Sequence, residues 1–315
     1  MARVNRNIAA EVVAAAVIAV IAGILLFNVM HVSGRAPATA ISSHKIKVVA
    51  AENFWGSLVS QLCGIHCNTT SIVADPNADP HEYEASTTDA KLISNAGFVI
   101  VNGVGYDDWA LKLLSAGSNA NRTVLDVAES LDIPNGSNPH LWYSPTYVNA
   151  TVRLMYLDLV KIDPSNASYY ALQYANLTSS LKQVDGRISE IRQQFGGAKV
   201  AATEDVFVYL ANSTGLDLVS PKEFMEAVAE GTDPSAQSLA EFQSQLESGN
   251  VSVLVYNKQT VTPLTQQMKQ IAAEHNISIV GITEIIQPPD VTYQTWMNGE
   301  LTDLQLALSA SAPGH

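Results

Sequence analysis

Residues 165–195 read SNASYYALQYANLTSSLKQVDGRISEIRQQF, and this stretch shows no strand pattern. Apolar residues recur in it every three or four positions, as they do along one face of an α-helix. They are Tyr170, Leu172, Leu177, Leu181, Val184, Ile188 and Ile191. Gly196 and Gly197 end the pattern. A helix of about thirty residues is about 45 Å long, so we expect a stiff rod at this place in the chain.

The chain on both sides of this helix alternates between short apolar runs and helical patterns. Residues 45–51 (KIKVVAA) and 98–102 (FVIVN) are apolar runs before the helix, and residues 199–203 (KVAAT) and 251–256 (VSVLVY) are apolar runs after it. Such alternation is typical of a parallel sheet with helices on both faces. We therefore predict an α/β fold with two lobes, each a mainly parallel sheet flanked by helices, joined by one long rigid connecting helix.

The predicted boundaries divide the chain into four segments. Residues 1–44 form a signal or anchor segment with a linker, 45–164 the N-terminal lobe, 165–197 the connecting helix and 198–315 the C-terminal lobe. Further strands are expected at 70–74, 216–219 and 277–282, and helices at 53–62, 87–95, 107–114, 146–162, 206–213, 236–247, 263–275 and 293–308. A chain of 315 residues is too long for one typical core and suits two domains.

The charge of the chain argues against nucleic acid as a partner. The formal net charge is −13, and charged residues make up only 15% of the sequence. An acidic surface repels the phosphates of nucleic acids. It suits a cation as the ligand, although many acidic proteins bind no metal, so the charge alone does not identify the ligand.

The first 44 residues carry an export or anchoring signal. Arg3 and Arg6 precede an apolar run at 8–32, and this order is typical of both kinds of signal. The run is long enough to cross a bilayer, whereas the ATA tripeptide at 38–40 matches a cleavage pattern that would cut near Ala40. We expect an uncleaved anchor, with the rest of the chain at the cell surface outside the cytoplasm. No cysteine directly follows the run, so lipid attachment there is excluded.

Glycosylation sequons are frequent. The N-x-S/T tripeptides without a middle proline begin at Asn68, Asn121, Asn135, Asn149, Asn166, Asn176, Asn212, Asn250 and Asn276. They predict a glycosylated, exported surface. The alternative is a chain that replaces charged residues with neutral polar ones, in which the sequons arise by composition.

Cys63 and Cys67 are the only cysteines, and His66 lies between them. Outside the cell, a short disulfide that closes the end of a helix is the first interpretation. Two buried free thiols are a second one. A metal site that includes His66 is a third, but a zinc site would need further ligands at this spacing, and none follow.

Four side chains stand in loops that follow predicted strands: His81, His140, Glu204 and Glu284. Open α/β sheets bind ligands outside the carboxyl ends of their strands. Two imidazoles and two carboxylates together suit one divalent transition-metal ion, because the imidazoles disfavour Ca²⁺ and Mg²⁺. Taken singly, a loop histidine is usually just solvated, and an acid at a strand end is often a helix cap.

The motifs around these residues resemble those of a known family. They are DPHEYE at 79–84, NGVGY at 102–106, NPHLW at 138–142 and TEDVFVYL at 203–210. Together they resemble the solute-binding proteins of zinc, manganese and iron ABC importers. That family carries a DPHxYE motif and then an NGxGxExW-like segment, in which Asp108 stands here where the family usually has Glu.

The resemblance implies that His81, His140, Glu204 and Glu284 bind the metal ion. Zinc-binding members commonly have His at the position of Glu204 and a loop rich in His and acids, which this chain lacks. This difference favours Mn²⁺ or Fe²⁺ over Zn²⁺. The family's fourth ligand is usually Asp, so either Glu284, whose extra methylene alters its reach, or another acid such as Asp290 takes that place.

The function implied is capture of one metal ion for an ABC importer, with its permease subunit as the partner. We expect a monomer and no enzymatic activity. A metal-dependent surface adhesin or a metal store on the same fold is one alternative. A metallohydrolase, with Glu82 or Asp205 as the general base, is another.

Overall fold

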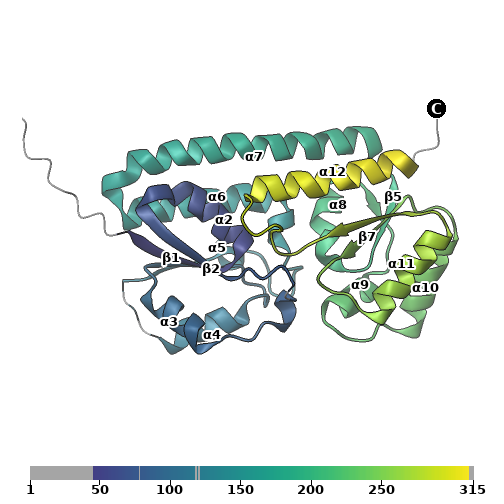
Figure 1. Ribbon diagram of the computed structural model, residues 1–315, viewed down its shortest axis with the longest axis horizontal. Coiled ribbons are helices and arrows are strands. Elements are labelled where there is room, and N and C mark those ends of the chain that lie inside the picture. The colour runs from purple at the N-terminus through teal and green to yellow at the C-terminus, as the bar shows by residue number, and fades with distance from the viewer. Residues whose placement is uncertain (1–44, 78, 118, 120, 312–315) are drawn as a thin grey trace, which may run out of the picture. The chain divides into compact units, whose positions relative to one another are not determined.

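Each of two lobes is built on a four-stranded parallel sheet (Figure 1). The computed structural model describes residues 45–77, 79–117, 119 and 121–311. They belong to one compact unit, Lys45–His315. The signal or anchor predicted at residues 1–44 lies outside the described residues, so this prediction stays open. The α/β fold with two lobes is confirmed.

The elements follow the predicted alternation. The N-terminal lobe contains β1 (Ile46–Glu52), α2 (Asn53–Cys63), β2 (Cys67–Val73), α3 (Thr87–Asn95), β3 (Phe98–Val101), α4 (Asp108–Ala116), β4 (Thr123–Asp126), α5 (Val127–Ser130) and α6 (Pro145–Ile162). After α7 (Ala167–Phe195), the C-terminal lobe contains β5 (Lys199–Ala202), α8 (Val208–Thr214), β6 (Asp217–Leu218), α9 (Lys222–Ala229), α10 (Ala236–Glu247), β7 (Val253–Asn257), α11 (Pro263–Glu274) and β8 (Ser278–Ile282). The last helix is α12 (Tyr293–Ser311).

The two sheets share one strand order, which fixes where a ligand can bind. The order is β2-β1-β3-β4 in the first lobe and β6-β5-β7-β8 in the second, and every pairing is parallel. In each lobe, therefore, the second strand of the chain lies on one side of the first strand, and the third and fourth strands lie on its other side. Ligands bind at this switch point, outside the carboxyl ends of the central strands. The switch points are β1/β3 and β5/β7.

The central strands are buried on both faces, which explains their continuous apolar sequences. All four residues of β3, FVIV, are buried, and in β7 only Tyr256 is partly exposed. Parallel strands covered by helices on both sides need such runs and not an alternating pattern. The edge strand β2 is more polar and keeps several partly exposed residues.

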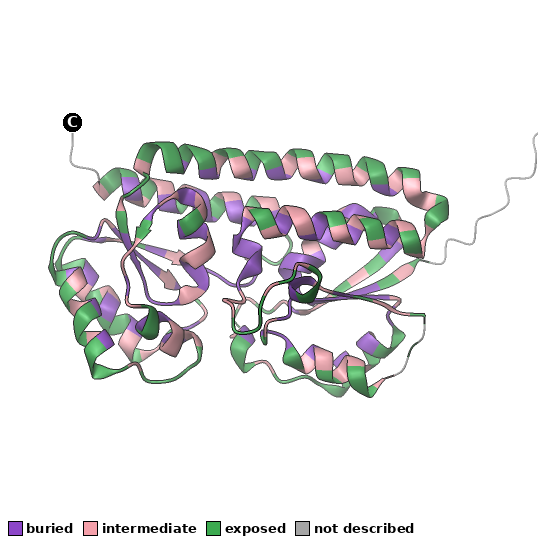
Figure 2. Cartoon of the chain, turned by 180° about the vertical axis from the view of Figure 1, so that it is seen from behind, coloured by how far each residue is buried: buried purple, intermediate pink, exposed green. Residues whose placement is uncertain are grey.

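The long connecting helix is confirmed as α7, with 29 residues. Its buried side chains lie along one face, whereas Leu172 is 58% exposed and does not belong to that face. Figure 2 shows the outward side of this helix as largely exposed. The helix α12 runs beside α7 (Figure 1). Tyr293 and Gln294, in its first turn, bond to Trp142 O and to the Gln61 side chain, so α12 is a second link between the lobes.

Three elements were missing from the prediction, namely β4, α5 and α9. β4 is a four-residue edge strand with a partly exposed Thr123 and Asp126, so its sequence carries no long apolar run. α5 has only four residues. α9 spans two turns after Pro221, and its buried residues are Phe224, Met225 and Val228. Short elements of this kind carry little periodicity, so sequence patterns do not reveal them. In addition, β2 begins at Cys67, three residues before the predicted start at 70.

Cys63 and Cys67 form a disulfide, with 5.6 Å between their Cα atoms. The bond joins the end of α2 to the first residue of β2, as the first interpretation predicted. His66 packs its ring against Tyr169 and Tyr170. Among the helices that the structure describes, none combines the length and the apolarity needed to cross a bilayer.

Candidate metal centre

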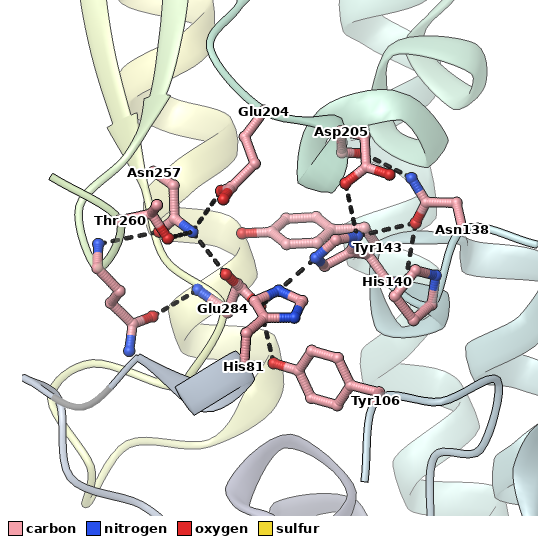
Figure 3. Close-up of polar contacts among 12 residues, drawn as sticks. His81, Tyr106, Asn138, His140, Tyr143, Glu204, Asp205, Asn257, Thr260 and Glu284 are labelled. Carbon is pink, nitrogen blue, oxygen red and sulfur yellow. Dashed lines mark hydrogen bonds and ion pairs between the residues drawn. The ribbon is translucent and has the colours of Figure 1, made fainter. Parts of the chain in front are cut away.

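Three side chains from distant parts of the sequence meet between the two lobes: His81, His140 and Glu284 (Figure 3). One nitrogen of each imidazole and one carboxylate oxygen lie within 4.8 Å of one another. His81 Nε2 is 3.2 Å and His140 Nε2 is 3.4 Å from the same atom, Glu284 Oε2. The side chains of His140 and Glu284 are fully buried, whereas that of His81 is 24% exposed. The fold thus brings together three of the four ligands that the sequence predicts.

Both histidines are presented by the same local turn. Asp79 Oδ1 accepts a hydrogen bond from His81 N, and Asn138 Oδ1 accepts one from His140 N, each at 2.9 Å. A side-chain oxygen that bonds two residues ahead closes a tight turn. The proline between the two residues also restricts the backbone. The sequence Asx-Pro-His therefore aims each imidazole before any ligand arrives.

The environment of His140 leaves one ring nitrogen available. Asn138 Nδ2 donates to Asp205 O at 2.7 Å, so Asn138 Oδ1 faces the His140 ring, 2.8 Å from Nδ1. This oxygen only accepts hydrogen bonds, so we assign the ring proton to Nδ1. His140 Nε2 is buried and has no hydrogen-bond partner among the described residues. The lone pair on Nε2 is therefore free to bind a metal ion, while the hydrogen bond at Nδ1 fixes the orientation of the ring.

Backbone hydrogen bonds fix Glu284 in the C-terminal lobe. Gln259 Oε1 accepts from Glu284 N at 2.7 Å and from Ile285 N at 3.0 Å. On α12, Glu300 Oε1 accepts from Thr283 N at 2.8 Å. The backbone at Thr283, Glu284 and Ile285 is thus held by hydrogen bonds to side chains, which limits its movement when a ligand binds.

The N-terminal lobe reaches the same carboxylate through Tyr106. Its hydroxyl donates to Glu284 Oε2 at 2.8 Å. The turn before it is tight: Gly103 has φ of 80°, and a Cβ atom there would lie 2.4 Å from Asp126 Oδ1. Glycine is therefore required at this position, and the NGVGY motif serves to place the tyrosine.

The acid that stabilises this turn is Asp107 and not Asp108. The Asp107 carboxylate is buried and accepts from Asn102 N at 2.5 Å and from Gly103 N at 2.9 Å. Asp108 is exposed at the start of α4. The assignment of Asp108 to the acidic position of the motif was therefore wrong by one residue, since NGxGxExW counted from Asn102 places its Glu at residue 107.

Glu204, the fourth predicted ligand, is outside the group of three donors and is linked to Glu284 through the side chain of Asn257. It stands two residues after the C-terminal end of β5, at the second switch point, and is buried. Its Oε2 accepts from Asn257 Nδ2 at 2.5 Å, and the same nitrogen donates to Glu284 Oε1 at 2.5 Å. Figure 3 shows the two carboxylates meeting at this amide. Glu204 Oε1 has no hydrogen-bond partner among the described residues.

The charges of the site are strongly coupled. Burial raises the pKa of Glu204 to about 8, and the nearby charge of Glu284 adds to this shift. Burial alone would lower the pKa of His81, but the hydrogen bond and charge of Glu284 raise it to about 9. Burial alone would also raise the pKa of Glu284, but the imidazoles of His140 and His81 beside it hold it well below its usual range. Glu284 is therefore the carboxylate that stays charged.

The donor distances fit a transition-metal ion. Donors about 2.1 Å from an ion at tetrahedral angles lie about 3.4 Å apart. The 3.2 and 3.4 Å separations from Glu284 Oε2 to the two imidazoles agree with this value. The buried, unpartnered atoms His140 Nε2 and Glu204 Oε1 are further donors in need of a partner. The residues present thus fit an ion with nitrogen and oxygen ligands.

A cleft of ≈ 710 Å³ leads to this group and is lined by residues of both lobes. Its acidic lining residues are Asp79, Glu82, Asp205, Glu226 and Glu230. Lysine and arginine are absent from the described lining. A cleft lined by one sign of charge concentrates the opposite ion, so this entrance favours a cation.

The acids that the sequence left as alternatives are not part of the group of three donors. Asp290 is exposed and does not belong to the group of three donors. Glu82 is exposed. Asp205 Oδ1 is 3.5 Å from His140 Nδ1, on the nitrogen opposite to the one that faces Glu284. The sequence argument missed Asn257, although a polar residue at the end of an apolar run was the same signal that identified Glu204.

Comparison with known proteins identifies the class. The family model of the periplasmic zinc-uptake complex component A, ZnuA, matches residues 48–307. The chain belongs to this family of metal ABC transporter substrate-binding proteins.

Individual relatives differ in the metal for which they are named. The chain is 24% identical over 255 residues to the manganese-binding lipoprotein MntA of Halalkalibacterium halodurans, covering 78% of this chain and 83% of that protein. It is 21% identical over 200 residues to the high-affinity zinc uptake system protein ZnuA of Bacillus subtilis, covering 58% and 61%. The periplasmic zinc binding protein TroA of Treponema pallidum has the same fold, with a TM-score of 0.71 at 16% identity over 84% of this chain and 99% of that one.

The pKa values predict how many protons leave when a metal binds. At pH 7, below both values, His81 and Glu204 each hold a proton in the metal-free protein. A metal ligand must be deprotonated, so binding at pH 7 should release roughly two protons, and metal affinity should rise with pH up to about 9. Isothermal titration in buffers of different ionisation enthalpy measures this number. Glu204→Gln should release about one proton fewer; an unchanged number would mean that Glu204 does not ionise on binding.

Proposed function

We propose that this chain captures one divalent transition-metal ion outside the cytoplasm and delivers it to the permease subunit of an ABC importer. The observation that carries the proposal is the convergence of His81, His140 and Glu284, whose donor atoms come from both lobes and lie within 4.8 Å of one another. Membership of the metal ABC transporter substrate-binding family supports delivery to an importer. The chain acts as a monomer and performs no chemistry on its cargo.

Capture requires only a small movement of the lobes. Two helices, α7 and α12, contact elements of both lobes. A wide hinge opening would break these contacts along both helices, so we infer a limited rocking motion. The ion enters through the acidic cleft, displaces the proton of His81 and is enclosed by donors from both lobes. Release follows when the permease moves the lobes apart.

Metal preference rests on Glu204 in this proposal. Two imidazoles and two carboxylates form a harder donor set than three imidazoles and one carboxylate. Oxygen donors shift the relative preference toward Mn²⁺ and Fe²⁺, although Zn²⁺ still binds more tightly to most sites of this composition. We therefore propose manganese or ferrous iron as the cargo, favoured over zinc by the oxygen donor of Glu204 and by supply. A relative named for manganese supports this choice.

The histidines give the direct test of the proposed site. His81→Ala and His140→Ala should each weaken metal binding by at least about tenfold, or about 1.4 kcal/mol, because each removes one donor atom. Isothermal titration with Mn²⁺ and Zn²⁺ measures the loss. His275→Ala is the matched control, because His275 is exposed at the end of α11 and outside the group of donors. If both site variants bind as tightly as the control, the metal is bound elsewhere.

Glu204→His tests the metal preference. The substitution replaces an oxygen donor with a third imidazole, so it should favour tetrahedral Zn²⁺ over Mn²⁺. A ligand that binds only the native state raises its stability, so thermal unfolding with each metal measures the preference. Glu241→His, at an exposed position on α10, controls for an added histidine. An equal Mn²⁺-to-Zn²⁺ ratio of stabilisation in wild type and Glu204→His would remove the main support for manganese or iron.

We also propose that the apolar run at 8–32 tethers the chain to the membrane. Arg3 and Arg6 flank this run, and no cysteine directly follows it that a lipid could modify. The full-length chain should therefore sediment with membranes, whereas a chain that begins at Ile41 should remain in the supernatant. Mass spectrometry of the native N-terminus supplies the opposing outcome: a mature chain that starts near Ile41 means cleavage and no anchor.

A further inference from the structure

Asn257 holds the two carboxylates of the site together. It is the last residue of β7, it is buried, and its Nδ2 lies 2.5 Å from both Glu204 Oε2 and Glu284 Oε1. Nδ2 also lies 3.2 Å from Thr260 Oγ1. The other end of the amide accepts a hydrogen bond from Gln259 N at 2.9 Å. A backbone N–H requires an oxygen there, so the orientation of the amide is fixed with its nitrogen toward the carboxylates.

Each carboxylate therefore has one oxygen that is hydrogen-bonded to Asn257 and one that is not. Glu284 Oε2 faces His81, His140 and the Tyr106 hydroxyl. Glu204 Oε1 is buried without a hydrogen-bond partner among the described residues. Glu284 Oε2 and Glu204 Oε1 are thus the oxygens available to an ion, whereas Glu284 Oε1 and Glu204 Oε2 are bonded to Asn257.

We propose that Asn257 restricts both carboxylates to one metal-binding oxygen each, so that the protein offers four donor atoms. This inference rests on the proposed metal site and adds a residue that determines its coordination. Bidentate binding by either glutamate would require an oxygen to leave the amide. That would leave a buried N–H donor without its acceptor, which is costly. Denticity is therefore set by a neutral residue that does not touch the ion.

The restriction affects manganese more than zinc. Four donors satisfy Zn²⁺, which is commonly tetrahedral, whereas Mn²⁺ favours additional oxygen ligands and an octahedral arrangement. Glu204 and Asn257 therefore have opposite effects on the preference for Mn²⁺ over Zn²⁺. Glu204 favours Mn²⁺ by supplying an oxygen donor, and Asn257 favours Zn²⁺ by limiting the number of donors. A site with unsatisfied coordination also holds manganese less tightly, which suits an ion that must be handed on.

Asn257→Ala tests the inference in the full-length chain. Loss of the amide frees one oxygen on each glutamate, so the number of protein oxygens bound to Mn²⁺ should increase in X-ray absorption spectra. With Co²⁺ as a probe, the strong visible absorption of a four-coordinate ion should fall toward the weak absorption of higher coordination. The affinity for Mn²⁺ relative to Zn²⁺ should rise by about tenfold. Asn257→Ser, which keeps a small polar side chain, provides a second variant if the alanine variant does not fold.

Asn53→Ala is the matched control. Asn53 is also a buried asparagine, and its amide bonds to the backbone of Ile286 at 3.0 and 3.2 Å without touching either carboxylate. Its removal should lower thermal stability and leave the Co²⁺ spectrum unchanged. A merely structural role of Asn257 predicts the same result for both asparagine variants, and that result overturns the inference.

The histidine variants separate this inference from the proposed function. If His140→Ala abolishes Co²⁺ binding but the Asn257 variants keep the wild-type Co²⁺ spectrum and metal ratio, the site stands and the restriction by Asn257 is wrong. If His140→Ala and Glu204→Gln both bind Co²⁺ as wild type does, the metal site itself is wrong, and the inference about Asn257 is wrong with it.

Discussion

The arrangement depends on one buried charge, the carboxylate of Glu284. An ionised carboxylate removed from water is destabilised by several kcal/mol unless hydrogen bonds and opposite charges compensate it. Here the compensation comes from both lobes, because His81, His140 and Tyr106 approach from the N-terminal lobe and Asn257 from the C-terminal one. The same contacts keep the lobes together around the site without an ion. In the proposed function, a cation that enters replaces the proton on His81 as the counter-charge, so little rearrangement is needed for binding.

The fold places this charge where it is because both lobes use the same strand order. Each lobe opens its switch point toward the other, between β1 and β3 in one and between β5 and β7 in the other. Glu204 and Asn257 stand at the carboxyl ends of β5 and β7. Asn102, directly after β3, links Trp55 Nε1 to Pro139 O. Buried polar residues at these strand ends thus connect the two sheets to the loops that carry the ligands.

The sequence predicts the parts of this arrangement that have periodicity or a motif. Buried strands such as β3 and the apolar face of α7 carry strong patterns, and the Asx-Pro-His turns identify His81 and His140. The role of α12 as a second link depends on contacts between residues more than a hundred positions apart, which no local pattern records. Asn257 was missed for a similar reason, since a polar residue at the end of a strand is common and only the packed structure shows what it bonds to.

Metal analysis of the protein purified without a chelator, followed by X-ray absorption spectroscopy of the bound ion, tests the central claim most directly. The account predicts one divalent transition-metal ion per chain, bound by two imidazole nitrogens and by carboxylate oxygens. A chain that carries no metal and takes up none on addition would contradict it. So would an ion whose spectrum contains no imidazole nitrogen, because no site built on His81 and His140 could produce that result.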